Sequence, residues 1–253
     1  MGSLSAAGAV DTVDQPPYTV VDCYRLDLCT SHAEDLTLLD QRERVRAARF
    51  RFERDRTRYI AAHAQMRRLL GLRLGVAPAA VPLTLTRHGK PVIMRDARAN
   101  ADAAGDDGPC RFNLTHSGAV GYLAVACCSV GIDVELHRPI EDLQPLIDTY
   151  CSPLEIASLA AMRPEERCVG FLGIWTRKEA ALKAWGTGIG AIALDRLHVG
   201  VDSQALPSRL AEPLAGEPPL YPDLRLKSLP GADQVLSVAA ATRQPMTVRM
   251  IGA

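Results

Sequence analysis

One stretch of the sequence constrains the fold more than any other, a helix-forming segment that ends in alternating glycines. It runs from Phe171 to Gly190. Its apolar residues recur at steps of three and four, which predicts one apolar stripe facing a core. The stripe consists of Phe171, Ile174, Trp175, Leu182 and Trp185, and so includes both tryptophans of the chain. The segment therefore predicts a helix against which the rest of the chain packs.

Three of the charged residues on the same predicted helix are candidates for a functional role. Glu179 and Lys183 are about one turn apart, so their side chains are neighbours. Such pairs are common on exposed helix faces, and by itself this pair is best interpreted as one of them. Lys178 falls inside the apolar stripe, where a lysine is costly unless it meets an anion or extends into a cleft. The helix alone does not distinguish surface charges from a site.

A second segment favours a functional site over surface charges. Gly131-Ile132-Asp133-Val134-Glu135 follows an apolar run, and in a strand Asp133 and Glu135 point to the same side. Adjacent carboxylates repel, which raises the pKa of at least one unless a cation lies between them, and such oxygen ligands suit Mg²⁺. The alternative is an edge strand with two solvated acids.

The two segments together resemble the signatures of the 4′-phosphopantetheinyl transferases. The first signature, Gly-[Ile/Val]-Asp-x-Glu, matches residues 131–135, and the second, Phe-x-x-x-Trp-x-x-Lys-Glu-x-x-x-Lys, matches residues 171–183 without a gap. Their order and spacing are more specific than either alone. The chain is similar to the long, two-halved type that modifies carrier domains of polyketide and nonribosomal peptide assembly lines.

The expected fold is α+β. Strand patterns close each half and helix patterns precede them, which indicates an α+β arrangement. The resemblance adds that two similar halves are related by a pseudo-twofold, each a small antiparallel sheet packed against helices. We expect a disordered lead over residues 1–17, an N-terminal half over 18–129 and a C-terminal half with the metal-binding motifs over 130–253. No residue-level repeat relates the halves.

Local patterns place elements in the N-terminal half. Alternation predicts a strand around residues 24–28, and Ser31-x-x-Glu34 predicts a capping box that starts a helix towards Phe50. The next helix carries an apolar stripe from Tyr59 to Leu70 and breaks near Gly75. Gly89-Lys90-Pro91 predicts a turn between two short strands.

The C-terminal half contains further signals. Ser152-Pro153-Leu154-Glu155 predicts a capped helix start, and Pro164 begins another helix that leads into the motif helix. Strands are then expected over residues 194–201, 224–229, 235–241 and 247–251.

The resemblance implies a set of residues that bind coenzyme A. Arg58, in Asp55-x-x-Arg58, is similar to a basic residue that meets the 3′-phosphate, and Arg46 is a second candidate. Lys90 matches a lysine that contacts the nucleotide phosphates. Thr115 and His116, in Asn113-Leu-Thr-His-Ser117, match a Ser-His pair with the same task, although the family usually has Ser in place of Thr115.

The resemblance also implies a reaction: transfer of 4′-phosphopantetheine from coenzyme A to a serine of an apo acyl or peptidyl carrier domain, with release of 3′,5′-ADP. Asp133, Glu135 and Glu179 would hold Mg²⁺, with Mn²⁺ as the alternative ion, and Lys183 would balance phosphate charge. Glu179 is the candidate base for the serine proton.

Other interpretations remain open at this point. A short, trimeric carrier-protein synthase of the same family is disfavoured by the length of 253 residues. A non-catalytic coenzyme A-binding or regulatory protein is disfavoured by the presence of all three acids. An unrelated globular protein would require both signatures to occur by chance.

The composition of the chain bears on which partners it binds and in which cellular compartment it works. The chain has 29 basic and 29 acidic residues, which gives no overall field for nucleic acid or an anionic membrane. The sequence has no run long enough to span a bilayer and no basic, apolar leader. Seven cysteines without a Cys-x-x-Cys pair indicate neither a disulfide framework nor a zinc site. We expect a reduced, cytoplasmic monomer.

Overall fold

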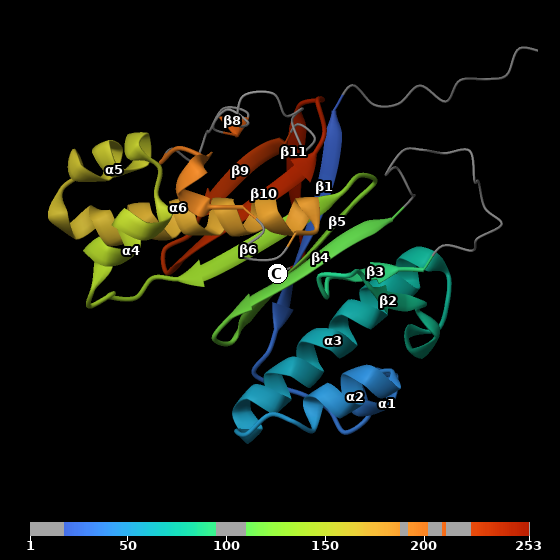
Figure 1. Cartoon of the computed structure of the whole chain (residues 1–253). Helices are drawn as coiled ribbons and strands as arrows, with labels where there is room; N and C mark the ends of the chain where they lie inside the picture. The colour runs from blue at the N-terminus through green and yellow to red at the C-terminus, as the bar shows by residue number, and fades with distance from the viewer. Residues whose placement is uncertain (1–17, 95–109, 188–191, 202–208, 211–223, 253) are drawn as a thin grey trace, which may run out of the picture.

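The computed structural model describes residues 18–94, 110–187, 192–201, 209–210 and 224–252 (Figure 1). The expected N-terminal lead, residues 1–17, lies outside these residues, as do residues 95–109. So do the last glycines of the motif segment, Gly188 and Gly190. The remaining expectations for strands and helices can be compared with the structure element by element.

The N-terminal half is built around one long helix. Its elements are β1 (Thr19–Asp27), α1 (Asp35–Leu38), α2 (Gln41–Ala47), α3 (Glu53–Leu74), η1 (Pro78–Ala80), β2 (Leu83–Leu85), β3 (Pro91–Ile93), β4 (Arg111–Ser117) and β5 (Val120–Ala126). The predicted Ser31–Glu34 capping box is wrong, because α1 starts without a side-chain cap. The box is formed by Asp40 and Glu43, which start α2.

The C-terminal half contains a second long helix. Its elements are β6 (Val130–Leu136), α4 (Leu143–Tyr150), α5 (Pro153–Ala160), α6 (Pro164–Trp185), η2 (Leu194–Arg196), β7 (Leu197–His198), β8 (Arg209–Leu210), β9 (Leu224–Pro230), β10 (Gln234–Ala241) and β11 (Met246–Ile251). The Ser152–Glu155 capping box is confirmed. A strand over residues 194–201 is not, because only Leu197–His198 pair with a neighbour.

The two halves share one connectivity. In each, a first strand leads through helices to a hairpin, and the last strand of that hairpin pairs with the first strand. The sheet orders are β1-β5-β4 in the N-terminal half and β6-β10-β9 in the C-terminal half. All of these pairs are antiparallel. The expected α+β fold with two similar halves is therefore confirmed, although no sequence repeat revealed it.

One strand of the C-terminal half pairs with the sheet of the N-terminal half. β11, at the end of the chain, joins the N-terminal sheet by pairing in parallel with β1. It covers an edge that β1 would otherwise present to solvent. The carboxylate of Asp22 on β1 fixes the arrangement, because it bonds both Arg249 on β11 at 2.7 Å and Arg73 on α3 at 2.9 Å.

α6 packs directly on the first strand of its half. It lies over β6 and β10 (Figure 1), and the contact is closest at Gly131. A Cβ at this position would lie 2.0 Å from the carbonyl oxygen of Ala180 and 2.4 Å from the backbone nitrogen of Ala184. The first residue of the Gly-Ile-Asp-Val-Glu motif is thus a glycine because the backbone of α6 leaves no room for a side chain.

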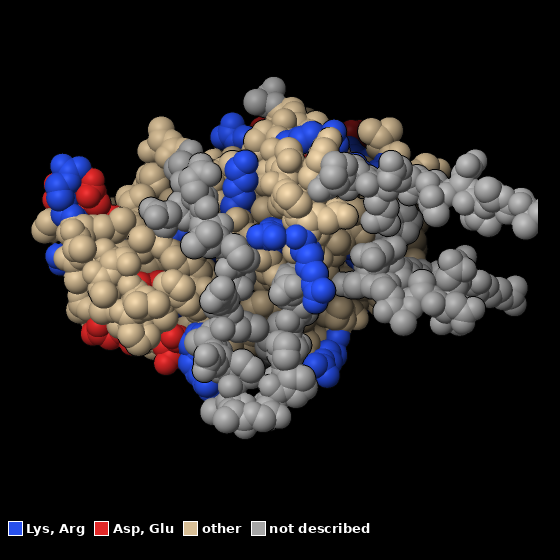
Figure 2. All heavy atoms as spheres, turned by 90° about the horizontal axis from the view of Figure 1, so that it is seen from above, with Lys and Arg blue, Asp and Glu red and all other residues tan. Residues whose placement is uncertain are grey.

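The surface and the thiols agree with the composition. On the face seen in Figure 2, the acidic side chains lie mainly on the side formed by α4–α6, and the basic side chains are spread over the face. All seven cysteines are free thiols. None of the described helices is both long enough and apolar enough to cross a membrane.

Candidate active site at the junction of the two halves

The two halves meet where β4 runs beside β6. Alternate residues of β4 point towards β6, since side chains on a strand alternate between its faces. Three of them bond β6 across the junction. Ile132 N donates to Asn113 Oδ1 at 2.9 Å, and Thr115 Oγ1 donates to Asp133 Oδ1 at 3.1 Å. Ser117 Oγ donates to Glu135 Oε2 at 3.1 Å and accepts from Leu136 N at 3.4 Å. The two motifs, distant in sequence, are therefore joined residue by residue.

Lys183 brings α6 into the same cluster. Its ammonium group donates to Asp133 Oδ1 at 2.6 Å, to the carbonyl oxygen of Ile132 at 3.3 Å and to Thr115 Oγ1 at 3.4 Å. Its side chain is 29% exposed, so Lys183 is only partly enclosed by the protein. This cation can therefore pair with Asp133 and still meet an anion that enters from outside.

Glu179 lies one turn before Lys183 and is buried, 8% exposed. The interpretation of Glu179 and Lys183 as an ordinary exposed surface pair is therefore wrong. Burial raises the pKa of Glu179; Lys183 opposes this rise, and Asp133 and Glu135 add to it. Glu179 is thus close enough to both acids of β6 to feel their charge.

The two acids of β6 show the same perturbation. Burial raises the pKa of Asp133, although the charge and hydrogen bond of Lys183 and the bond from Thr115 act against it. Burial and the charge of Asp133 raise the pKa of Glu135. Three carboxyl groups whose charged forms are each disfavoured are therefore gathered at one junction, a pattern typical of functional sites.

Unpartnered atoms test whether this donor set suits a metal ion. Asp133 Oδ2 and Glu179 Oε1 are buried, and neither has a hydrogen-bond partner among the described residues. Buried carboxylate oxygens without a partner are costly, and a hard dication would satisfy both. The described side chains do not form a closed cluster of three ligands, so the set of three acids would close only if at least one of them moved. All three residues have the oxygen ligands that Mg²⁺ prefers, and two of them, Asp133 and Glu179, have an oxygen free of hydrogen bonds to the described residues.

His116 follows Thr115 on β4, so its side chain points to the opposite face of the strand, and it is exposed. Desolvation lowers the pKa of His116, and the positive charges of Lys183, His63 and Arg58 lower it further. Arg58, on the second turn of α3, is 4.0 Å from Asp55. Arg46 on α2 is near Tyr59, whose pKa is raised to about 12 by burial and Glu43 while Arg46 acts in the opposite direction.

Lys90 occupies a place that the sequence did not indicate. Its ammonium group donates to the carbonyl oxygens of Val130 at 3.0 Å and Lys183 at 2.6 Å. The turn between β2 and β3 therefore attaches the N-terminal half to the start of β6 and the end of α6. A cation near the last carbonyls of a helix also interacts favourably with the helix dipole.

Lys178, which the sequence left unassigned, has a structural partner. It is fully buried and donates to Glu155 Oε2 at 2.7 Å and to the carbonyl oxygens of Tyr150 and Leu194. All three of its protons are thus bonded away from the junction. Lys178 fixes α6 against α4, α5 and η2.

Sequence reasoning missed three residues of this junction. Asn113 and Ser117 were quoted only as part of a motif, although each bonds β6, and Gly131 was named without the packing reason that requires it. The alternation of Asn113, Thr115 and Ser117 along one strand was the available signal, because it places all three side chains on one face.

Comparison with known proteins covers both halves. A family model described as 4′-phosphopantetheinyl transferase superfamily matches residues 129–235. A second, described as 4′-phosphopantetheinyl transferase, N-terminal, matches residues 29–128. The two matches meet where β6 begins, so each covers one structural half.

Individual relatives agree with the family models. The 4′-phosphopantetheinyl transferase HetI of Nostoc sp. is 36% identical over 169 residues, which are 66% of this chain and 68% of that protein. A putative 4′-phosphopantetheinyl transferase of Synechocystis sp. is 29% identical over 60% of this chain and 58% of its own length. A phosphopantetheinyl transferase of Thraustochytrium sp. is 30% identical over 66% of this chain and 59% of its own length. The chain is therefore an enzyme that belongs to the 4′-phosphopantetheinyl transferase superfamily.

Proposed function

We propose that the chain transfers 4′-phosphopantetheine from coenzyme A to a serine hydroxyl of an apo carrier protein and releases 3′,5′-ADP. The serine oxygen forms a bond to the phosphorus that bears pantetheine. The bond from that phosphorus to the bridging oxygen breaks, and the electron pair leaves with the nucleotide. The serine proton passes to a base of the enzyme.

One observation carries this proposal: two buried carboxylate oxygens, Asp133 Oδ2 and Glu179 Oε1, have no hydrogen-bond partner among the described residues, and the partly exposed Lys183 bonds the other oxygen of Asp133 at 2.6 Å. Transfer of a phosphoryl group depends mainly on positioning and on stabilisation of charge. A site with unsatisfied acids and an accessible cation matches this need, because the acids can hold a dication and the lysine can meet a phosphate oxygen.

The acids have two tasks in this proposal. Asp133, Glu135 and Glu179 would hold Mg²⁺, or Mn²⁺ in its place, and the bound ion would neutralise charge on the diphosphate. Glu179 accepts the serine proton, directly or through water, because burial already favours its protonated form. Lys183 balances negative charge on the diphosphate.

The remaining residues bind the nucleotide. Thr115 and His116 contact phosphates from the end of β4, and Arg58 and Arg46 supply positive charge from the helices of the N-terminal half. Lys90 adds positive charge from across the junction while two carbonyls hold its ammonium group. The carriers in this proposal are acyl and peptidyl carrier domains of polyketide and nonribosomal peptide pathways, and the enzyme acts as a cytoplasmic monomer.

The decisive experiment is a transfer assay with coenzyme A and purified apo carrier proteins. Intact-mass measurement should show addition of one phosphopantetheine per carrier in the presence of Mg²⁺ and a loss of that addition when a chelator is present. Asp133→Asn should reduce turnover by about 10²-fold or more, because the position loses a charged ligand. Asp148→Asn, at an exposed residue of α4, is the matched control. Wild-type turnover by Asp133→Asn would remove the proposed site.

A further inference from the structure

The last turn of α6 is held in part by the other half of the molecule. The last carbonyl groups of a helix have no partner within its regular bonding pattern. In α6, the carbonyl oxygen of Lys183 accepts from Lys90 Nζ at 2.6 Å, and that of Ala184 accepts from Ser129 Oγ at 2.7 Å. Lys90 Nζ also donates to the carbonyl oxygen of Val130, at the start of β6, at 3.0 Å. Lys90 is therefore a capping residue that the N-terminal half supplies to a helix of the C-terminal half.

The turn that carries Lys90 is itself bonded closely. The backbone N–H of Lys90 donates to Thr86 Oγ1 at 3.1 Å, and its carbonyl oxygen accepts from Thr86 N at 2.9 Å. Gly89, at φ 81°, supplies the left-handed conformation of this turn. Because the backbone and the ammonium group of Lys90 are both held, its half-buried side chain has a defined course from the turn to α6.

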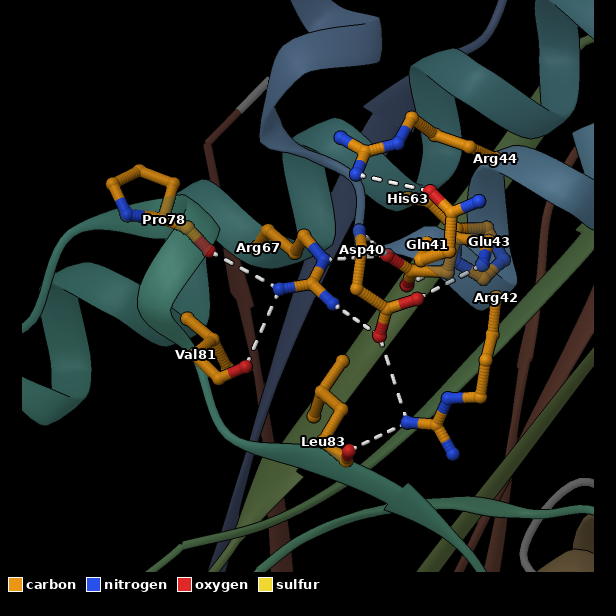
Figure 3. Close-up of polar contacts among 10 residues, drawn as sticks. All are labelled: Asp40, Gln41, Arg42, Glu43, Arg44, His63, Arg67, Pro78, Val81 and Leu83. Atoms are coloured by element: carbon orange, nitrogen blue, oxygen red, sulfur yellow. Dashed lines mark hydrogen bonds and ion pairs between the residues drawn. The ribbon is translucent and has the colours of Figure 1, made fainter.

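The base of the same hairpin is anchored on the helices of the N-terminal half. Figure 3 shows Arg42 on α2, which donates to the carbonyl oxygen of Leu83, the first residue of β2, at 2.6 Å. It also shows Arg67 on α3, which is fully buried and donates to the carbonyl oxygen of Val81 at 3.3 Å. The β2–β3 hairpin therefore connects α2 and α3 at its base with α6 at its turn.

The residue at the end of this connection is the cation of the candidate site. The side chain of Lys183 bonds Asp133 Oδ1 at 2.6 Å, while Lys90 bonds its backbone carbonyl. The two ends of Lys183 are thus fixed by different elements. Stabilisation of charge on a diphosphate depends on preorganised groups, and a misplacement of about 1 Å can cost about 10²-fold in rate. A displaced last turn of α6 would move this ammonium group away from Asp133.

We propose that Lys90 is a positioning residue of the transfer reaction, which caps the last turn of α6 and thereby holds the ammonium group of Lys183 beside Asp133. This inference rests on the proposed function and deepens it, because the hydrogen bonds of Lys90 then matter in addition to its charge. Its effect on the reaction passes through Lys183. A residue that only added positive charge would act independently of Lys183.

Steady-state transfer assays on Lys90→Met test this role. The variant should lower kcat about tenfold and change KM for coenzyme A by less than about threefold, because a displaced Lys183 loses stabilisation of the transition state rather than uniform binding. Arg87→Met removes the same charge from an exposed arginine of the same turn, which bonds His88, and should leave both constants near their wild-type values. A rise in KM for Lys90→Met with an unchanged kcat would overturn the proposal, since it would show a direct contact with the donor.

A variant without any change of charge separates capping from charge. Ser129→Ala removes the other bond to the last turn of α6 and should lower kcat about threefold, because a neutral hydrogen bond contributes less than one to a charged group. Ser158→Ala, at an exposed serine that bonds a carbonyl of its own helix, is the matched control. A wild-type kcat in Ser129→Ala would contradict the dependence of transfer on this cap.

A double-mutant cycle measures the coupling between the two lysines. Lys90→Met should lower the rate about tenfold in the wild type but less than about twofold in the Lys183→Met background, because the group that Lys90 positions is then absent. An undiminished effect in that background would show that Lys90 acts by itself, and the positioning role would be wrong.

Amide hydrogen exchange tests the cap without an assay of activity. The amides of Gly186 and Thr187 donate to carbonyls of the last turn of α6, and they should exchange about tenfold faster in Lys90→Met because this turn opens more readily. The amide of Gly75, at the corresponding end of α3, should keep its wild-type rate and shows that the variant is folded.

The exchange experiment also separates this inference from the proposed function. Unchanged exchange at Gly186 and Thr187 would overturn the capping role of Lys90 even where transfer is confirmed. Absence of transfer by the wild type would overturn the proposed function, and exchange would still decide whether Lys90 holds the turn that carries Lys183.

Discussion

The same ionic device holds the long helix in each half of the molecule. α3 and α6 each begin 14 residues before a fully buried cation, Arg67 and Lys178. Each cation pairs with the glutamate of a capping box on a preceding short helix, Glu43 on α2 and Glu155 on α5. Each glutamate also lies near a histidine ring. The halves thus share their internal support as well as their connectivity.

The halves differ at the next residue of each helix. Arg68 on α3 is 38% exposed in its side chain and pairs with Asp35 at 2.5 Å. Glu179, at the equivalent place on α6, is buried with an unpartnered oxygen. At this position the charged side chain of the N-terminal half is paired, whereas that of the C-terminal half leaves an oxygen without a partner among the described residues. A common scaffold becomes a candidate active site where packing prevents a carboxylate from finding a partner within the protein.

The largest expected effect contrasts these equivalent positions. Glu179→Gln should lower kcat for transfer by about 10²- to 10⁴-fold, because the amide neither accepts the serine proton nor carries charge for a metal ion. Arg68→Gln should keep kcat within about twofold, since its partners are Glu34 and Asp35, which the proposed reaction does not use. Initial rates at saturating coenzyme A and carrier provide the measurement, and equal losses in both variants would erase the functional contrast.

Next in size is the effect of removing the shared support. Arg67→Met and Lys178→Met should each lower the free energy of unfolding by about 3–5 kcal/mol, because each leaves a buried glutamate charge without its partner. Urea denaturation followed by circular dichroism measures both, with Arg54→Met, at an exposed arginine of α3, as control. A loss below about 1 kcal/mol for either variant would show that the two helices are not held in the same way.

The helices, strands and motifs of each half could be predicted from the sequence better than the contacts between residues distant in sequence. Both motif segments and most strands could be predicted because period-2 and period-3.6 patterns are local. The apolar stripe on residues 171–185 understated the burial of α6, which also encloses Thr176, Arg177 and Lys178. The burial of a cation cannot be predicted until its acidic partner is known. The partner of Lys178 is Glu155, which is 23 residues away in sequence, so no local pattern indicates the pair.

The structural similarity of the two halves and the pairing partner of β11 also could not be predicted from local patterns in the sequence. The pairings Arg67–Glu43 and Lys178–Glu155 use different residue types at the cation, so a comparison of letters finds no repeat. Parallel pairing of β11 with β1 joins opposite ends of the chain, and no local pattern contains that information. Among the candidate site residues, the structure gathers Thr115, Asp133, Glu179 and Lys183, and it gives Lys90 partners that no motif implied.

The pH dependence of stability should have opposite signs in the two halves. For Glu43, desolvation raises the pKa but the bonds from His63 and the backbone of Asp40 outweigh it, so its pKa is lowered. It therefore stabilises the fold above about pH 4.5, and that contribution is lost as the pH falls through the lowered pKa. Burial raises the pKa of Asp133, so its contribution becomes less favourable as the pH rises above about 4.

Matched amide variants measure these signs. Relative to the wild type, Glu43→Gln should lose about 1–2 kcal/mol at pH 7 and less at pH 4, whereas Asp133→Asn should lose least, or gain, at pH 7 in the absence of metal. Addition of Mg²⁺ should stabilise the wild type by mass action and leave Asp133→Asn nearly unaffected. Denaturation curves at several pH values supply the data, and parallel pH profiles for the two variants would contradict the contrast.

The smallest expected effect concerns the ends of the two long helices, where the halves are most alike. α3 and α6 both end at a glycine in the left-handed conformation, Gly75 at φ 68° and Gly186 at φ 73°. An alanine Cβ would meet no atom within 4 Å at Gly75 and only Lys90 Cδ at 4.0 Å at Gly186. Each Gly→Ala change should therefore lower the free energy of unfolding by about 1 kcal/mol through backbone strain alone.

Gly186→Ala should also lower the rate of transfer more than Gly75→Ala does. The change disturbs the turn after Lys183, whose carbonyl oxygen accepts a hydrogen bond from Lys90. Equal stability losses combined with unequal rates would show that the two helix ends share a fold but not a function.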